Sequence, residues 1–301
     1  MPGEARHILT PAATRLASAG IESSRTDARL LLGLAIGRDG PVLPHENVDH
    51  ITAAQLADFA ELIERRLTGE PVSRMRGWRE FWSLRFAISP ATLDPRPDSE
   101  TLVESAVAFA RQLRSGPATD PLRVLDLGTG SGCLLLSCLS ELPGAIGLGV
   151  DINPDAITIA RQNARSLGLQ DRTTFVEGDF TGAIVATAMD DARHLGGFDI
   201  VLCNPPYIPS SEIDDLALDV ADFDPRLALD GGDDGFDSWR GVLPIIATVM
   251  ATDGRAFVEI GDGQADALDV VGLAAGLRPE GRACDLSGTI RTLIYRRNAN
   301  N

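Results

Sequence analysis

The spacing of hydrophobic and polar residues divides the chain into an N-terminal helical part and a longer α/β part. Apolar residues recur every three or four positions in residues 9–20, 24–37 and 52–67, which is typical of amphipathic helices. From residue 122 onwards, short apolar runs that read as strands alternate with helical patterns. The sequence therefore predicts a small helical domain followed by a doubly wound α/β sheet.

The stretch between these two parts predicts a β-hairpin. Aromatic and aliphatic residues crowd residues 78–88, and the rigid polar segment 94–100 follows and leads into a helix predicted over 99–113. The aromatic residues either join two domains or help to form the wall of a site. The predicted domain boundaries are 1–75 for the helical domain, 76–100 for the hairpin linker and 101–301 for the sheet domain.

Six strands and four helices are predicted in the α/β part. The strands are Arg123–Leu127, Ile146–Val150, Thr173–Glu177, Phe198–Cys203, Gly254–Ile260 and Arg291–Tyr295. The helices are Gly132–Ser140, Pro154–Gly168, Ser238–Met250 and Gly263–Ala275. Because helices that alternate with strands connect parallel strands, we expect a parallel sheet with its ligands at the C-terminal strand ends.

A glycine-rich segment follows the first predicted strand. Three glycines in five residues let the backbone turn tightly and approach a ligand closely. Asp151 ends the next strand, where a carboxylate would accept hydrogen bonds from the ribose hydroxyls of NAD or S-adenosylmethionine. Residues 123–151 hold one cation, Arg123, and Asp126 would repel a pyrophosphate, so S-adenosylmethionine is favoured. The candidate residues here are Asp126, Gly128, Thr129, Gly130, Ser131, Gly132 and Asp151.

The tetrapeptide Asn204–Tyr207 follows the fourth predicted strand. Its amide side chain has one acceptor and two donors in one plane, and its two prolines lack N–H donors, so nearby carbonyls stay free to accept. The segment is either a stiff turn or a clamp for a planar –NH2 group. At the end of the third strand, Asp179 and Phe180 could hold an adenine, or Asp179 could cap a short helix. The candidate residues of the clamp are Asn204, Pro205, Pro206 and Tyr207.

Composition and charge narrow the classes of function. The 301 residues carry a formal net charge of -16, which repels nucleic-acid phosphates over most of the surface. The four cysteines form no CxxC pair and the histidines are scattered, so we expect free thiols and no metal site. Since no apolar run approaches a membrane span and no secretory signal is visible, a cytoplasmic protein is expected.

The motifs together resemble those of class I S-adenosylmethionine-dependent methyltransferases, and more closely those of the HemK/PrmC family of peptide chain release factor glutamine methyltransferases. The Asn-Pro-Pro-Tyr segment is shared with methyltransferases that act on amino groups of DNA bases, whereas the segments around residues 79–100 and 223–235 are family-specific. One departure is Asp262, where an aromatic residue is expected. The matching segments are 69–71, 79–82, 95–100, 126–132, 151, 204–207, 223–229, 231–235 and 259–261.

The resemblance implies a role for each candidate residue. The loop from Gly128 to Gly132 would line the methionine end of the cofactor, with Asp151 at the ribose and Phe180 near the adenine. The side chain of Asn204 and the carbonyl of Pro205 would accept hydrogen bonds from the –NH2 group of a substrate glutamine. The side chain of Tyr207 would pack on the plane of that amide.

The resemblance also implies the substrate and the partner. The acceptor would be the glutamine of the Gly-Gly-Gln loop of class I release factors. Apart from the resemblance, we expect a monomer, with no membrane contact because of the hydropathy and no direct nucleic-acid contact because of the acidic net charge. The helical domain would dock the partner through Arg65, Arg66 and Arg74, or these arginines are solvated. Alternatives are a glutamine of a ribosomal protein, an adenine amino group in nucleic acid, and a non-catalytic binding protein, which the presence of Asn204 and the glycine loop disfavours.

Overall fold

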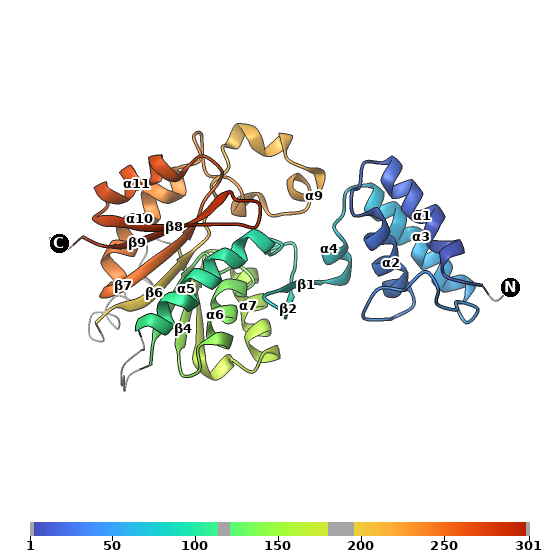
Figure 1. Cartoon of the computed structure of the whole chain (residues 1–301), viewed down its shortest axis with the longest axis horizontal. Helices are drawn as coiled ribbons and strands as arrows, with labels where there is room; N and C mark the ends of the chain where they lie inside the picture. The colour runs from blue at the N-terminus through green and yellow to red at the C-terminus, as the bar shows by residue number, and fades with distance from the viewer. Residues whose placement is uncertain (1–2, 114–120, 180–195, 299–301) are drawn as a thin grey trace. The chain divides into compact units, whose positions relative to one another are not determined.

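The computed structural model describes residues 3–113, 121–179 and 196–298 of the chain (Figure 1). It divides into two compact units. The N-terminal unit comprises Met1–Gly77 together with Leu216–Phe223, and the sheet unit comprises Trp78–Asp215 with Asp224–Asn301. The sequence pattern did not indicate that a segment near residue 220 belongs with the N-terminal helices.

The N-terminal unit is helical and has a hydrophobic core of its own. The helix α3 begins at a capping box, in which the Thr52 hydroxyl accepts a hydrogen bond from the Gln55 amide and the Gln55 side chain accepts one from the Thr52 amide. The buried side chains that the helices share include Leu16, Leu31 and Ile63. The helices are α1 (Arg6–Ser18), α2 (Ser24–Ala35), α3 (Ala53–Leu67), α4 (Val72–Arg76) and α9 (Leu218–Ala221).

One arginine of the predicted docking cluster is part of this core instead. Arg66 donates to Asp27 at 2.8 Å and to the carbonyl of Gly69 at 3.1 Å. The two charged side chains are only 12% and 9% exposed, so removing either would leave an unpaired buried charge. Arg66 therefore holds α2 and α3 together, whereas Arg65 is an exposed partner of Glu70.

The sheet unit contains a hairpin and a seven-stranded sheet. The hairpin strands are β1 (Trp78–Phe81) and β2 (Leu84–Ala87). The sheet strands are β3 (Arg123–Leu127), β4 (Ile146–Asp151), β5 (Thr173–Glu177), β6 (Phe198–Cys203), β7 (Met250–Glu259), β8 (Leu277–Cys284) and β9 (Ile290–Arg297). The helices are η1 (Pro97–Ser99), α5 (Glu100–Leu113), α6 (Cys133–Glu141), α7 (Pro154–Ser166), η2 (Gln170–Arg172), η3 (Ser210–Asp215), η4 (Arg226–Ala228), α10 (Asp237–Val249) and α11 (Ala265–Ala274).

The strand order of the sheet is β5-β4-β3-β6-β7-β9-β8. The strands β3 to β7 run parallel, and the chain reverses its direction across the sheet between β3 and β6. Ligands of doubly wound sheets bind at such a switch point, because the loops that leave its two central strands diverge to opposite faces. The Rossmann-like arrangement predicted from the sequence is thus confirmed in its parallel part.

The prediction of a parallel, doubly wound sheet holds for β3 to β7 but not at one edge of the sheet. The strand β9 pairs antiparallel with both β7 and β8, and β8 is not among the strands predicted from the sequence. This edge strand contains Pro279 and Gly281, and its register shifts between them. Since both residues weaken a strand pattern and are tolerated at edges and bulges, the segment gave no strand signal.

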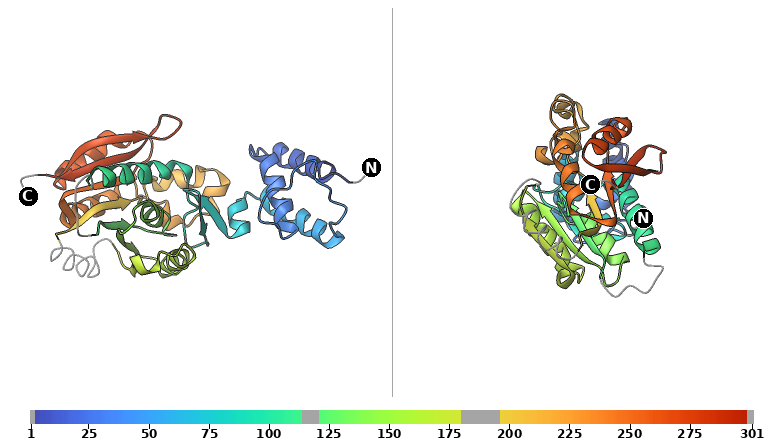
Figure 2. Two further views of the ribbon diagram at one scale, coloured as in Figure 1. Left: turned by 60° about the horizontal axis from the view of Figure 1, so that its bottom comes forward. Right: turned by 90° about the vertical axis from the view of Figure 1, so that its left-hand side faces the viewer.

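Helices cover both faces of the sheet (Figure 2). One face packs on α5, α6 and α7, with Leu102, Leu135 and Phe257 fully or almost fully buried. The other face packs on α10 and α11 around Trp239 and Tyr295. Because both faces are covered, the central strands read as continuous apolar runs in the sequence.

The buried amide of Asn163 joins the hairpin to the glycine-rich loop. Its side-chain oxygen accepts from the Ala87 amide at 2.8 Å, and its nitrogen donates to the carbonyls of Ala87 and Ser131 at 3.0 and 2.8 Å. All of its donors and its acceptor are therefore used. The hairpin is thus fixed to the sheet unit next to the loop that follows β3.

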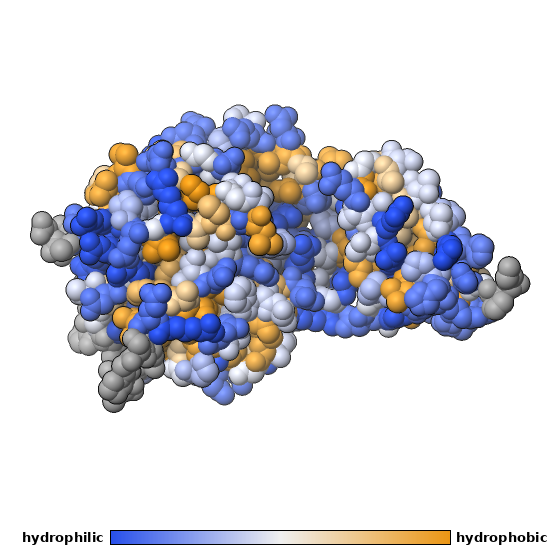
Figure 3. Space-filling view, viewed as in Figure 1, coloured by the Kyte–Doolittle hydropathy of each residue, from blue (hydrophilic) through white to orange (hydrophobic). Residues whose placement is uncertain are grey.

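Hydrophilic residues predominate on the face drawn in Figure 3, and hydrophobic residues occur there in small groups. In the described part of the chain, no helix is both long and apolar enough to span a membrane.

The charges are unevenly distributed along the sequence. Residues 1–77 contain nine arginines and ten carboxylates, whereas residues 78–301 contain eighteen arginines and thirty-three carboxylates.

Candidate active site

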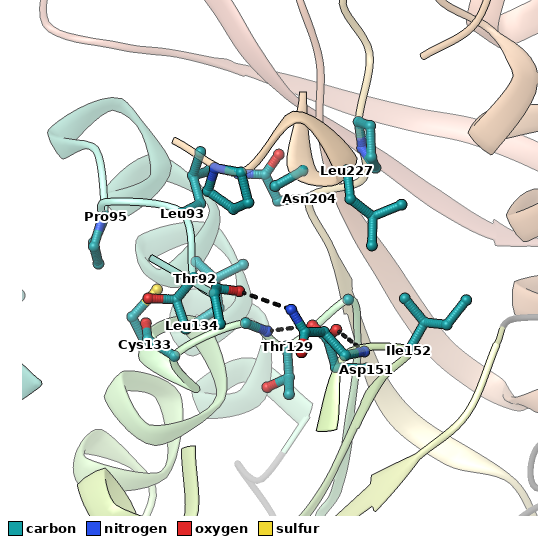
Figure 4. Close-up of a pocket in the computed structure, with 18 of the residues that line it drawn as sticks. Thr92, Leu93, Pro95, Thr129, Cys133, Leu134, Asp151, Ile152, Asn204 and Leu227 are labelled. Carbon is teal, nitrogen blue, oxygen red and sulfur yellow. Dashed lines mark hydrogen bonds between the residues drawn. The ribbon is translucent and has the colours of Figure 1, made fainter. Parts of the chain in front are cut away.

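A cavity of about 270 Å³ lies at the C-terminal ends of β3, β4 and β6, at the switch point of the sheet. In Figure 4, Asn204 and Leu227 lie on one side of this cavity, and Asp151 and Thr129 lie on the other. Its described lining comes from six stretches of chain, within residues 91–99, 128–134, 151–153, 178–179, 204–206 and 225–238.

Most of the residues predicted from the sequence line this cavity. They are Gly128, Thr129, Gly130, Ser131, Asp151, Asp179, Asn204 and Pro206. Within the described residues, Asp126, Gly132, Pro205 and Tyr207 are not part of the lining. Phe180 lies outside the residues that the structure describes, so its predicted place near an adenine stays a prediction.

The glycine-rich loop has a conformation that its sequence requires. Gly128, Gly130 and Gly132 all have positive φ angles, of 75°, 54° and 80°, a region that side chains with a Cβ disfavour. The amides of Gly128 and Thr129 both donate to the carbonyl of Val150 at 2.9 Å, which ties the loop to the end of β4. The loop therefore presents bare backbone to the cavity.

The carboxylate of Asp151 is held rigidly on the cavity wall. One oxygen accepts from the Gly130 amide at 2.8 Å, and the other accepts from the Asn153 amide at 2.9 Å. Burial raises the pKa of Asp151, and these backbone donors partly oppose that rise. Each oxygen retains a lone pair for a ligand hydroxyl, as expected of a residue that binds a ribose.

Asp126 has a different position from the one that the sequence suggested. It is fully buried beneath the loop, where it accepts a hydrogen bond from the Thr129 hydroxyl at 2.7 Å. Burial raises the pKa of Asp126 to about 7, with a further rise from the nearby charge of Asp151 and an opposing effect of Thr129. We therefore assign Asp126 to supporting the loop from below.

The Asn204–Tyr207 segment leaves the end of β6 and turns over the cavity. Asn204 and Pro206 line it, whereas Pro205 is buried and does not. The hydroxyl of Tyr207 points to Glu259, with 3.4 Å between Tyr207 Oη and Glu259 Oε1. Burial raises the pKa of Tyr207, so its ring is a neutral packing group.

Segments distant in sequence hold this tetrapeptide in place. The side-chain nitrogen of Gln264 donates to the Tyr207 carbonyl at 3.0 Å, and its oxygen accepts from the Gly261 amide at 2.9 Å. A Cβ at Gly235 would lie 2.6 Å from the Tyr207 carbonyl oxygen, and one at Gly231 would lie 2.9 Å from its carbonyl carbon. These glycines are therefore required for close backbone approach, which the sequence alone did not reveal.

The wall opposite the glycine loop is fixed by a buried carboxylate. Asp224 accepts from Arg96 at 2.5 Å and from the Asp94 amide at 3.1 Å, with its side chain almost completely buried. These bonds connect the segment after the hairpin to the segment that carries Pro225 and Leu227 into the cavity. Both segments belong to the family-like part of the sequence, but their charged residues were not predicted to have a role in the site.

The chemistry of the lining fits S-adenosylmethionine. Among the described residues, three acidic residues line the cavity, Asp151, Asp179 and Asp230, and the one cationic lining residue, Arg96, is paired with Asp224. Such a lining favours a ligand with positive groups and disfavours a pyrophosphate. The rigid Asp151 carboxylate would bind the ribose, and the bare loop at Gly130 would admit the methionine part closely.

Comparison with known proteins agrees with this chemistry. Residues 7–77 match the family described as PrmC N-terminal domain, and residues 118–262 match the family described as methyltransferase domain. A release factor glutamine methyltransferase of Bradyrhizobium diazoefficiens is 43% identical, over 95% of this chain and 92% of the relative. One of Rhodospirillum rubrum is 45% identical, over 97% and 85%.

A solved structure shows the same fold. The catalytic domain of hMettl16, in complex with the MAT2A 3'UTR hairpin 6, aligns with a TM-score of 0.51 at 13% identity, over 71% of this chain and 76% of that chain. The fold and the cavity at its switch point define an S-adenosylmethionine-dependent methyltransferase. From its relatives, the chain belongs to the release factor glutamine methyltransferase family.

Proposed function

We propose that this enzyme methylates the side-chain amide nitrogen of the glutamine in the Gly-Gly-Gln motif of class I peptide chain release factors. The observation that carries this proposal is the position of Asn204. Its amide lies on the wall of the cofactor cavity, at the end of β6 and across the cavity from Asp151. Family membership supports the choice of acceptor, because the relatives are named for methylating glutamine in release factors.

The acceptor needs help from the protein because an amide nitrogen is a poor nucleophile. Its lone pair is delocalised into the adjacent carbonyl. The Asn204 side-chain oxygen and the Pro205 carbonyl would each accept one N–H of the substrate, which raises electron density on nitrogen and aims it into the cavity. Holding the reacting atoms in line contributes up to roughly 7–11 kcal/mol to lowering the barrier.

The transfer balances without a covalent enzyme intermediate. S-adenosylmethionine, which Asp151 and the loop at Gly130 would hold, would supply an electrophilic methyl group. The substrate nitrogen would take this methyl group with its lone pair, the sulfur would keep the electron pair of the bond that breaks, and the nitrogen would then release one proton to water. The apolar residues Leu93, Leu134 and Leu227 line the cavity and exclude water from the reacting atoms until transfer is complete.

A direct assay tests this function. The protein is incubated with methyl-labelled S-adenosylmethionine and, in separate reactions, a purified class I release factor, large-subunit ribosomal proteins, or DNA. We expect label on the release factor alone, located by mass spectrometry on the glutamine of its Gly-Gly-Gln motif. Replacing that glutamine with alanine is the matched control. Label on DNA or ribosomal protein without label on the release factor would overturn the proposal.

We further infer a cytoplasmic, monomeric enzyme whose helical domain docks its protein partner and which does not bind nucleic acid. The excess of thirty-three carboxylates over eighteen arginines in residues 78–301 supports the last point. Arg65 and Arg74 are the remaining candidate contacts of the docking domain, since Arg66 is held in its core. Substitution of Arg65 by alanine should raise the KM for the release factor while leaving the KM for the cofactor unchanged.

A further inference from the structure

A buried glutamate lies directly behind the substrate clamp. In the paired strands β6 and β7, Cys203 is opposite Val258, so the next residues along these parallel strands, Asn204 and Glu259, are neighbours at the sheet edge. Glu259 is only 3% exposed and does not line the cavity. Its carboxyl therefore contacts the clamp from the protein side and cannot touch a ligand.

The donors that surround Glu259 come from the clamp itself and from η1. The Tyr207 hydroxyl approaches Oε1 to 3.4 Å. Burial is the largest effect on Glu259 and raises its pKa, hydrogen bonds from Ser99 and Asn204 oppose that rise, and the resulting pKa is about 7. Oε2 has no partner of good hydrogen-bond geometry among the described residues. A buried carboxyl of this kind requires an explanation, because its desolvation is costly.

The neighbouring charges compensate Glu259 only in part. The positive charge of Arg291 lowers the pKa of Glu259, but Arg291 is shared with Asp285 at 3.0 Å and Asp98 at 3.3 Å. The negative charge of Asp98 raises the pKa of Glu259. The charge of Glu259 in turn raises the pKa of the Cys133 thiol on α6, in addition to the larger effect of burial. The groups that face Glu259 thus do not form a simple ion pair with it that would account for its burial by stabilising the fold.

The side-chain amide of Asn204 can adopt two orientations, and a neighbouring carboxylate can select one of them. An asparagine side chain can turn over, which would present its nitrogen to the substrate instead of its oxygen. An ionised carboxylate only accepts hydrogen bonds, so it selects the orientation in which the Asn204 nitrogen faces Glu259. The oxygen of Asn204 then faces the cavity, where an acceptor is needed for the substrate N–H.

We propose that Glu259 is a positioning residue, whose ionised carboxyl fixes the amide of Asn204 and the hydroxyl of Tyr207 in the orientation that receives a substrate –NH2 group. The role rests on the proposed function of the clamp, because it requires an acceptor that donates N–H groups. Glu259 has no part in holding the cofactor.

The variant Glu259→Gln tests this role with little change in volume. We expect turnover to fall about tenfold to a hundredfold, because the neutral side chain can donate to the Asn204 oxygen and turn the amide over. The cofactor Kd, measured by calorimetry, should change less than about twofold, which is about 0.4 kcal/mol. Glu104→Gln on the exposed face of α5 is the matched control and should behave as wild type.

Two further measurements separate positioning from a general structural role. Wild-type turnover should decline as the pH falls through about 7, since Glu259 then gains a proton, and Glu259→Gln should lack this decline. In the Asn204→Ala background, Glu259→Gln should lower turnover by no more than about twofold, because the two residues act as one unit. Equal pH profiles of the two enzymes, or additive losses, would overturn the proposal.

A spectroscopic readout keeps the proposal testable if the proposed acceptor is wrong. The side-chain ¹⁵N–H signals of Asn204, assigned from their loss in Asn204→Ala, should shift with pH as Glu259 titrates in the wild type. They should show no such titration in Glu259→Gln. If the Asn204 signals do not shift with pH in either protein, the proposed role of Glu259 is wrong. Absence of methyl transfer to the release factor would contradict only the proposed function.

Discussion

The two walls of the cavity are built in opposite ways. The cofactor wall consists of the loop after β3 and the end of β4, and its hydrogen bonds join neighbours such as Gly130 and Asp151. The acceptor wall consists of four residues after β6, which are held by Gln264, Glu259 and the glycines near residue 233. Local sequence thus shapes the first wall, whereas the second depends on contacts across the whole unit.

This difference explains which residues a motif can reveal. A glycine loop carries its own conformational requirement, and an acid about twenty residues later completes the site. The Asn-Pro-Pro-Tyr segment carries the reactive groups but not the means of orienting them. An amide group acquires a defined direction only from the groups packed around it.

The sharpest way to separate the two walls is Asn204→Ala. We expect kcat with the release factor to fall about 100- to 1000-fold, because an acceptor aimed at the reacting group is removed. The cofactor Kd from calorimetry should stay within about threefold, which is less than 1 kcal/mol. Asn298→Ala, at an exposed position near the end of the described chain, is the control. A large loss of cofactor affinity would assign Asn204 to the other wall.

Asp151→Asn is the corresponding change on the cofactor wall. The amide can preserve only part of the hydrogen bonding from Gly130 and Asn153, and it lacks the charge that strengthens a bond to a ribose hydroxyl. The cofactor Kd should rise about tenfold to a hundredfold, since a hydrogen bond to a charged group is worth about 1.5–3 kcal/mol. Asp155→Asn, exposed in the first turn of α7, should bind as wild type. An unchanged Kd in Asp151→Asn contradicts the ribose assignment.

Gly235→Ala tests whether distant segments support the clamp. The added Cβ would lie 2.6 Å from the Tyr207 carbonyl oxygen, and φ at Gly235 is +76°. Gly168→Ala has a similar φ of +69° but meets no atom within 4 Å, so it isolates backbone strain from steric displacement. We expect turnover to fall about tenfold in Gly235→Ala alone. Equal activities of the two variants would show that the clamp does not need this contact.

The smallest expected effect concerns Asp126 and the pH dependence of stability. Its pKa is about 7 in the folded protein and near 3.9 in an unfolded chain. Between these pH values the folded state retains a proton that the unfolded state has lost, so stability falls as the pH rises. Asp126→Asn should therefore raise Tm at pH 8 by about 2–4 °C, for about 1 kcal/mol.

The comparison for Asp126→Asn is made by thermal unfolding at two pH values. At pH 4, where Asp126 is protonated in the fold, the variant should unfold within about 1–2 °C of the wild type, because its hydrogen bond from Thr129 is retained. A variant that is less stable than the wild type at pH 8 would indicate that the carboxyl is ionised and stabilised beneath the loop.

The sequence by itself determined the parallel strands, the glycine-rich loop with Asp151, and the position of the Asn-Pro-Pro-Tyr segment. These features depend on residue periodicity and on backbone conformations that are determined by residues close together in the sequence. It also placed the family segments near residues 95 and 225 in order, without showing that they meet. Its prediction of a parallel sheet did not extend to the antiparallel edge, because β8 is an edge strand interrupted by Pro279 and Gly281.

Only the tertiary structure decided which groups reach the cavity. It placed Asp126 beneath the loop, turned the Tyr207 hydroxyl toward Glu259, and buried Arg66 against Asp27. Burial and hydrogen-bond partners depend on residues that are far apart in the chain, and one sequence does not specify those pairings. Four consecutive residues supply the functional groups of the clamp, but the orientation of those groups is set by strands and loops that pack around them.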